Sequence, residues 1–239
     1  DSLGGKYITA QDVGISEADM VAVSKVTPHV AGLPGQGGDP GPYTARGVFL
    51  GVKAAVKHAL GTDDLHGVHV AIQGVGSVGG GLARYLAAEG AKLTLADVDA
   101  QRATDLAHEL GGQSVAADTI MTLEADVFSP CALGAVLTES SVAALKVRAV
   151  AGGANNQLAT GAEGRMLADR GILYAPDYVI NAGGIINVLR QIENADDAEI
   201  NRRVDGIAGR LAAIWNESDS TGKTPAEVAD NMAQKLIGR

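Results

Sequence analysis

Three glycines at fixed spacing carry the clearest chemical signal in this chain. Gly74, Gly76 and Gly79 form a G-x-G-x-x-G pattern directly after an apolar run and directly before a helical pattern. The first glycine permits a tight turn, the second lets a pyrophosphate approach the bare backbone, and the third lets helix and strand pack closely. Ser77 and Val78 lie where this helix is expected to begin, and free N–H groups at a helix start attract phosphate. The pattern predicts a dinucleotide site; the alternative is that these glycines serve close packing only.

A carboxylate further along the chain indicates which dinucleotide would bind. Asp97 ends the next predicted strand, 18 residues beyond Gly79. A carboxylate at that place can accept hydrogen bonds from both hydroxyls of the adenosine ribose and repels a 2′-phosphate. We therefore expect NAD as the cofactor in preference to NADP. The plainer alternative is that Asp97 caps a turn.

The elements that would position these residues alternate along the chain. We expect strands at 68–73, 92–97, 114–116, 125–130, 147–153 and 171–180, with helices at 78–89, 100–110 and 163–170 between them. Strands that alternate with amphipathic helices indicate βαβ units and a parallel sheet. The predicted fold class is α/β, a Rossmann-like doubly wound parallel sheet.

The two ends of the chain differ from this middle part. Before it we expect a short strand at 6–10, a helix from the N-cap Ser16 to about residue 25, and a hinge rich in Gly and Pro at 32–42. After residue 194 we expect only helices: one at 198–216, a polar turn at 217–224, and a last helix with Pro225 in its first turn. The chain is thereby divided at 1–42, 43–195 and 196–239.

Composition narrows the class of protein. Hydrophobic residues make up 46% of the 239 residues, as in a folded globular protein, and the net charge of −9 argues against nucleic acid and anionic membrane surfaces as partners. No apolar run approaches the roughly 20 residues that cross a bilayer, and no signal peptide opens the chain. A single cysteine, Cys131, suits a reducing compartment, so we expect a cytoplasmic protein. The histidines form no convincing metal set, and we expect no metal.

Six stretches resemble, in order, the amino-acid dehydrogenases that act on leucine, valine, phenylalanine and glutamate. They are YITAQDVG (7–14), GDPGPYTARGV (38–48), QGVGSVG (73–79), FSPCALGAVL (128–137), AGGANNQL (151–158) and LYAPDYVINAGGIINV (173–188). The resemblance is nearer to the leucine and phenylalanine branch than to the glutamate branch. It implies NAD-dependent, reversible oxidative deamination of an L-amino acid to its 2-oxo acid and ammonium.

The resemblance also implies a role for each matching residue. Asp12 matches the catalytic aspartate that exchanges a proton with the substrate nitrogen. The implied cofactor contacts are Thr44, Asn155 and Asn181, on the nicotinamide side, together with Cys131 and Ala132. The implied substrate contacts are Asn156, Ile185 and Val188. Each position also has a plain structural explanation. Asp12 could cap a turn, Thr44 could be a helix N-cap, the paired asparagines could serve turn geometry, and Ile185 and Val188 could be ordinary core.

One departure from the family pattern matters for function. The family's N-terminal part forms most of its substrate domain and carries a glycine-rich run ending in lysine, plus a second lysine that activates water and binds the substrate carboxylate. Residues 1–239 contain neither lysine, because the GGK at 4–6 stands directly before YITAQDVG. We therefore expect 1–42 to be a remnant of that domain with its hinge, 43–195 to bind NAD, and 196–239 to return toward the substrate domain.

Three functional hypotheses remain open from the sequence. The first is the cofactor-binding part of a leucine/phenylalanine-type dehydrogenase whose small-molecule substrate is an L-amino acid or its 2-oxo acid, as a homo-oligomer or with a complementing N-terminal segment. The second is an isolated, non-catalytic NAD-binding module. The third, a hydroxy-acid dehydrogenase, would need a catalytic histidine in the last third of the chain, and no histidine follows His108.

Overall fold

The computed structural model describes residues 1–12, 14–34 and 39–238. Its centre is a six-stranded parallel sheet in the order β3-β2-β1-β4-β5-β6. The strands are β1 His69–Gln73, β2 Lys92–Ala96, β3 Gln113–Ser114, β4 Val127–Pro130, β5 Ala149–Val150 and β6 Leu173–Tyr174. The chain builds outward from β1 to β3 and then returns to the other side of β1. The predicted doubly wound α/β fold is thereby confirmed.

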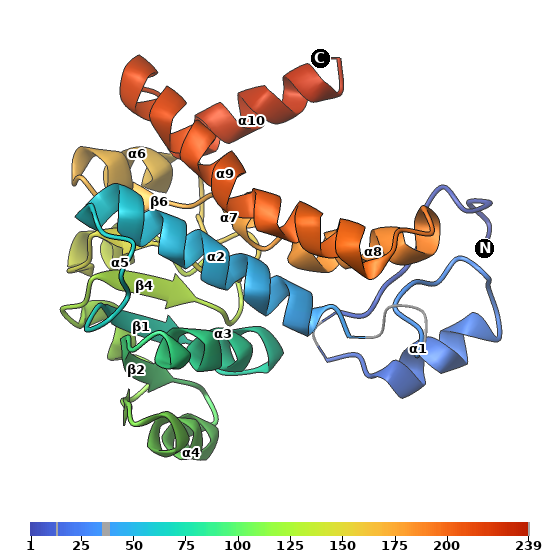
Figure 1. Ribbon diagram of the computed structural model, residues 1–239, viewed down its shortest axis with the longest axis horizontal. Helices are drawn as coiled ribbons and strands as arrows, with labels where there is room; N and C mark the ends of the chain where they lie inside the picture. The colour runs from blue at the N-terminus through green and yellow to red at the C-terminus, as the bar shows by residue number, and fades with distance from the viewer. Residues whose placement is uncertain (13, 35–38, 239) are drawn as a thin grey trace.

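Helices cover both faces of this sheet (Figure 1). They are α1 Glu17–Ser24, α2 Gly41–Leu60, α3 Ser77–Ala88, α4 Ala100–Leu110, α5 Glu139–Ala144, α6 Ala162–Asp169, α7 Asp177–Ile180, α8 Gly183–Ile192, α9 Asp197–Thr221 and α10 Pro225–Leu236, with a 3₁₀ turn η1 at Ile120–Thr122. The N-terminal segment with α1 lies beyond the end of the sheet, on the side where α2 begins (Figure 1). None of the helices in the described ranges is both long enough and apolar enough to span a membrane.

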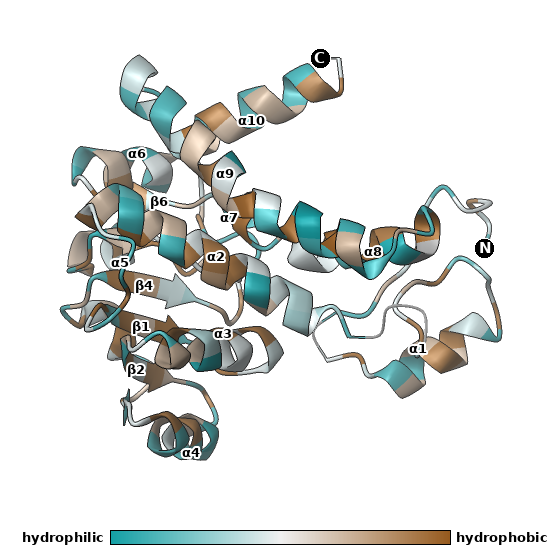
Figure 2. Cartoon of the chain, in the orientation of Figure 1, coloured by the Kyte–Doolittle hydropathy of each residue, from teal (hydrophilic) through white to brown (hydrophobic). Residues whose placement is uncertain are grey.

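Successive side chains of a strand point to opposite faces of the sheet, so each strand contributes to the core on both faces. In β1, Val70 and Ile72 join the core under α2, α3 and α9, whereas Ala71 joins the core under α5 and α6. Phe128 of β4 lies on that second face as well. The visible parts of β1 and β2 are accordingly hydrophobic (Figure 2). Both faces are buried, as expected for a parallel sheet.

The C-terminal helices belong to the first of these cores. Ile207, Leu211 and Trp215 of α9 are buried in the same cluster as the β1 side chains. The indole N–H of Trp215 donates a 2.9 Å hydrogen bond to the carbonyl oxygen of Tyr174 in β6. α9 therefore packs on α2 and on the β6 end of the sheet, and α10 packs against α9.

Several predicted boundaries were correct for a clear physical reason. The first helix has Ser16 as its N-cap, and Ser16 and Asp19 form a reciprocal capping box. The helix predicted at 100–110 has those bounds, with Asp99 as its N-cap and Gly111 in the left-handed conformation after it. Pro225 opens α10 behind the N-cap Thr224.

Other predicted boundaries were wrong. The strand expected at 171–180 ends at Tyr174, because Pro176 has no N–H to donate to the sheet and becomes the N-cap of α7. The strand expected at 6–10 is reduced to one bridge, between Thr9 and Val30. The polar turn expected at 217–224 is shorter, since α9 continues to Thr221. Of the expected hinge at 32–42, residues 35–38 lie outside the described residues, and 41–42 are already helical.

The Trp215 hydrogen bond gives a stability prediction. Trp215→Phe keeps most of the apolar burial but leaves the buried Tyr174 carbonyl without its donor. We expect the free energy of unfolding to fall by about 1–3 kcal/mol, measured by urea denaturation with far-UV circular dichroism. Tyr85→Phe is the matched control, because the ring stacks on Phe49 and is partly exposed; it should change stability by less than about 0.5 kcal/mol. Equal stability of Trp215→Phe and the native protein would contradict the assignment.

Candidate functional site

The glycine turn lies at the carboxyl end of β1, where β1 passes into α3. Gly74 has a φ of +87°, which glycine adopts readily and other residues do not. Its N–H donates to the carbonyl of Ala96 at the end of β2, at 2.7 Å. A Cβ on Gly74 would also come within 2.8 Å of the Cβ of Ala132. The first glycine of the pattern is thus required by both conformation and space.

The other two glycines differ in what surrounds them. A Cβ on Gly79 would collide with the carbonyl oxygen of Gly74, so α3 can lie this close to the turn only with glycine there. A Cβ on Gly76, the N-cap of α3, would meet nothing within 4 Å. The protein itself therefore gives no packing reason for glycine at position 76. Open space beside the first N–H groups of α3 fits a phosphate group of a dinucleotide.

Asp97 lies immediately beside this turn. Its side chain is only 7% exposed, and its Oδ2 accepts a 2.8 Å hydrogen bond from the N–H of Val75. Its Oδ1 accepts from the N–H of Asp99 at 3.0 Å and lies 3.8 Å from Nη1 of Arg102. Asp97 therefore does cap the turn, as the alternative interpretation proposed. A carboxylate has about four acceptor positions, so capacity remains for the ribose hydroxyls.

Cys131 and Ala132 follow β4 and form the next wall of the turn. The N–H of Cys131 donates to the carbonyl of Gln73 at 2.7 Å, which continues the sheet hydrogen bonding past β4. Its Sγ accepts from the N–H of Gly153 at 3.4 Å and lies 3.5 Å from Oγ of Ser129. Burial raises the pKa of the Cys131 thiol above its ordinary value. Cys131 therefore lies at the edge of the site as an uncharged thiol.

The three predicted asparagines lie on two neighbouring loops. Nδ2 of Asn181 donates to Oδ1 of Asn155 at 2.5 Å and to the carbonyl of Gly153 at 3.3 Å. Asn156 has a φ of +50°, and its carbonyl accepts from the N–H of Ala135 at 2.6 Å. The structure brings Asn155 and Asn181 together. It also gives Asn156 the turn geometry that the sequence left as an alternative.

The first turns of α2 and α8 are pressed together by glycine. A Cβ on Gly183 would collide with the carbonyl oxygen of Tyr43, and one on Gly184 would come within 2.7 Å of Oγ1 of Thr44. The alternative interpretation, that Thr44 is the N-cap of α2, is wrong, because the N-cap is Pro40. The helix begins earlier, at Gly41, and the Thr44 hydroxyl donates to the carbonyl of Pro40 at 3.0 Å. Thr44 therefore lies at the contact between the two helices.

The predicted substrate residues are accessible. Ile185 is 67% exposed, so the alternative that it belongs to the core is wrong, and Val188 is half-buried one helical turn further along α8. Asp12 is exposed and precedes α1 in the N-terminal segment. Ile185 and Asp12 are thus exposed to solvent, and Val188 is partly so.

Sequence reasoning missed a polar cluster on α8. Nη2 of Arg190 donates to Oη of Tyr43 at 3.0 Å, and the same guanidinium pairs with Asp197 at the start of α9. Asn187, which is buried, lies with its Oδ1 3.5 Å from Nε of Arg190. The signal was present as an Asn and an Arg three residues apart in an otherwise apolar stretch. Their partners come from α2 and α9, which no local pattern identifies.

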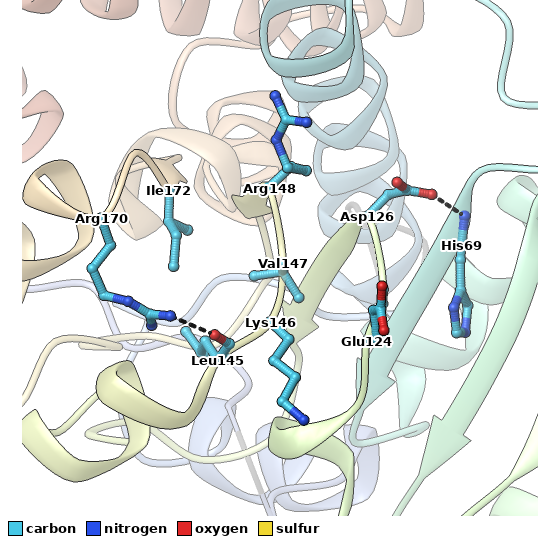
Figure 3. Close-up of a pocket in the computed structure, with 10 residues that line it drawn as sticks. His69, Glu124, Asp126, Leu145, Lys146, Val147, Arg148, Arg170 and Ile172 are labelled. Carbon is cyan, nitrogen blue, oxygen red and sulfur yellow. Dashed lines mark hydrogen bonds between the residues drawn. The ribbon is translucent and has the colours of Figure 1, made fainter.

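A cavity of about 640 Å³ lies at the opposite end of the strands from the glycine turn, at the amino ends of β1, β4 and β5. Figure 3 shows His69, Asp126 and Arg170 around it. They serve the fold: Asp126 accepts from the N–H of His69, and Arg170 donates to the carbonyl of Leu145. Ligands of doubly wound folds bind outside the carboxyl ends of the strands. The glycine turn is therefore the candidate site. No cluster of three or more candidate metal ligands occurs in ranges 1–12, 14–34 and 39–238.

Comparison with known proteins identifies relatives along the whole chain. The family model for glutamate/leucine/phenylalanine/valine dehydrogenase matches residues 93–235, more than half of the chain. A leucine dehydrogenase of Thermoactinomyces intermedius is 42% identical over 98% of this chain. A phenylalanine dehydrogenase of Bacillus thermotolerans is 38% identical over 99% of it. The crystal structure of L-tryptophan dehydrogenase from Nostoc punctiforme covers all of the chain with a TM-score of 0.87 and 39% identity.

The match covers nearly all of this chain but only about two thirds of each relative. The chain spans 65% of the length of the leucine dehydrogenase, 64% of the phenylalanine dehydrogenase and 69% of the tryptophan dehydrogenase. About a third of each relative therefore has no counterpart in residues 1–239.

The contrast between Gly76 and Gly79 gives a second stability prediction. Gly79→Ala should destabilise the fold by about 1–3 kcal/mol or more, because its Cβ meets the backbone oxygen of Gly74 and the backbone must shift. Gly76→Ala should change the free energy of unfolding by less than about 0.5 kcal/mol, because its Cβ enters open space. Urea denaturation of the two variants measures the difference. Equal losses in both would mean that the helix does not approach the turn as described.

Proposed function

This chain belongs to the glutamate/leucine/phenylalanine/valine dehydrogenase family, and on that basis we propose that residues 1–239 form the NAD-binding part of an amino-acid dehydrogenase. The reaction we propose is oxidative deamination of an L-amino acid of the leucine, valine or phenylalanine type to its 2-oxo acid and ammonium. NAD, when bound, accepts a hydride from the α-carbon of the amino acid.

The observation that carries the proposal is the open space at Gly76. It lies beside the first N–H groups of a helix that Gly79 allows to sit against the turn, and a Cβ at position 76 would meet no atom within 4 Å. These N–H groups have no acceptor within their own helix and lie at its positive end. Such a place favours a group with negative charge and little bulk, which is what a pyrophosphate presents.

The residues around the turn have separate tasks in this proposal. The stretch from Gly74 to Gly79, with Ser77 and Val78, holds the pyrophosphate, and Asp97 accepts from the adenosine ribose. Thr44, Asn155 and Asn181 place the nicotinamide end, and Cys131 and Ala132 contact the cofactor beside the glycine turn. The substrate contacts are Asn156, Ile185 and Val188, the last two along its side chain, and Asp12 exchanges a proton with its nitrogen.

Part of the catalytic apparatus must come from outside residues 1–239. Deamination needs a base that activates water next to the iminium carbon, and a single exposed carboxylate such as Asp12 does this poorly. The relatives extend well beyond the matched part, and we place that base in the corresponding region. We propose that the substrate is a small molecule and that the protein acts in the cytoplasm. We also propose that the chain either forms a homo-oligomer or works together with a complementing N-terminal segment. The division at 1–42, 43–195 and 196–239 stays a prediction.

Cofactor choice tests the role of Asp97. The free protein should bind NADH at least about tenfold more tightly than NADPH, because a 2′-phosphate would approach the carboxylate; fluorescence titration measures both affinities. Asp97→Asn should narrow the gap, whereas Asp105→Asn, the same charge change on the exposed side of α4, should not. Gly76→Val should lose affinity for both cofactors. Equal affinity of the native protein for NADH and NADPH would refute the role given to Asp97.

Turnover tests the division of labour. Residues 1–239 alone should bind NADH but form none from leucine, valine or phenylalanine with NAD, followed by NADH absorbance. Adding the family's N-terminal segment with its glycine-rich lysine run should restore turnover. In the restored enzyme Asp12→Asn should lower kcat far more than cofactor affinity, and Glu17→Gln, an exposed carboxylate on nearby α1, should lower neither. Turnover of residues 1–239 alone at an ordinary rate of about 1–10³ per second would favour a complete enzyme. Binding without any restoration would favour an isolated NAD-binding module.

A further inference from the structure

One carboxylate joins the first residues of α2 and α3. Oδ1 of Asp39 accepts a 2.7 Å hydrogen bond from the N–H of Gly41, which opens α2. Its Oδ2 accepts a 3.2 Å hydrogen bond from the hydroxyl of Ser77, which opens α3. The two helices are in close contact here, because a Cβ on Gly41 would collide with the Ser77 hydroxyl. Asp39 therefore lies between two helix N-termini.

The Asp39 carboxylate lies in surroundings that would also attract an anionic ligand. Both helices direct the positive ends of their dipoles toward it. Both hydrogen-bond donors to Asp39 are neutral, and no Lys, Arg or His of the described ranges forms an ion pair with it. Asp39 and Ser77 are both exposed, so the bond between them can exchange without unpacking the core.

A cofactor pyrophosphate at the N-terminus of α3 would need one of the two donors that hold Asp39, the Ser77 hydroxyl. It would lie at the N-terminus of α3, where Ser77 offers both its N–H and its hydroxyl. The hydroxyl has a single proton, and that proton is directed at Asp39. A phosphate beside it would also meet the negative charge of Asp39 at short range.

We propose that Asp39 is an affinity-determining residue that competes with the cofactor's pyrophosphate for the N-terminus of α3. It keeps the Ser77 hydroxyl engaged and places a negative charge next to the phosphate position. The inference rests on the proposed function, since it requires a dinucleotide at this turn. It adds a residue outside the G-x-G-x-x-G pattern and Asp97 that sets how tightly the dinucleotide is held.

Asp39→Asn tests the inference, because the amide has the shape of the carboxylate. Its oxygen can still accept from the N–H of Gly41, and its NH₂ group can donate to the Ser77 oxygen, which frees the hydroxyl proton. We expect NADH and ADP-ribose to bind about three- to tenfold more tightly than to the native protein. Adenosine, which has no phosphate, should bind with unchanged affinity. Isothermal titration calorimetry measures all three ligands, and thermal denaturation checks that the variant is folded.

Two further variants complete the experiment. Asp63→Asn makes the same charge change beyond the other end of the 20-residue helix α2 and should leave all three affinities unchanged. Ser77→Ala should weaken NADH binding more in the Asp39→Asn background than in the native protein, because the hydroxyl is free to meet phosphate only there.

The outcomes separate this inference from the proposed function. Equal or weaker NADH binding by folded Asp39→Asn would overturn the inference while leaving the proposed function intact. An equal gain for adenosine would overturn it as well, because the effect would then not act on phosphate. Absence of NADH and ADP-ribose binding to both the native protein and Asp39→Asn would overturn the proposed function and the inference with it.

Discussion

The contact between Gly79 and the carbonyl oxygen of Gly74 is the constraint on which the candidate site depends. A methyl group at position 79 would overlap that oxygen, so the missing side chain sets how closely α3 approaches the end of β1. This approach carries the first N–H groups of α3 to the edge of the sheet, next to the open space at Gly76. Gly74 meets its own constraint at the same place, through its left-handed backbone and its contact with Ala132. Electrostatics at the site therefore follows from a steric fact about the backbone.

The same principle extends to the helices around the site. Gly47 and Gly51 of α2 lie against Ile180 and the side chains of α9, and Gly183 of α8 lies against the backbone of Tyr43. Each glycine removes the side chain that would hold two elements apart. The chain has few aromatic residues, and its core is built from Ala, Val, Ile and Leu. Small side chains allow close packing of this kind, and the start of α2 is thereby held beside both α3 and α8.

The N-termini of α2 and α3 meet at Asp39, which gives the site a balance of charge. Two helix dipoles attract an anion, and the protein provides one of its own through Asp39. Asp97 adds a second carboxylate next to the turn, held by the backbone N–H groups of Val75 and Asp99. A dinucleotide at this turn would enter a place where helix dipoles attract it and carboxylates restrict how much negative charge it can bring.

The amino-acid sequence by itself determined the local parts of this protein. The order of strands and helices, the capping of α1, α4 and α10, and the position of the glycine turn all follow from residues close together in the chain. An apolar run alone overestimated one strand: the strand expected at 171–180 stops at Tyr174, and α7 begins after Pro176.

Only the tertiary structure decided which distant residues meet. Asp39 and Ser77, Asn155 and Asn181, and Arg190 and Tyr43 are separated by many residues and carry no mutual signal in the sequence. Tertiary structure also distinguished the glycines: Gly79 is required by the protein's own packing and Gly76 is not, although the pattern presents them as equals. The physical reason is that periodicity and capping report on neighbours within a turn or two of the chain, whereas a close approach depends on how whole elements pack.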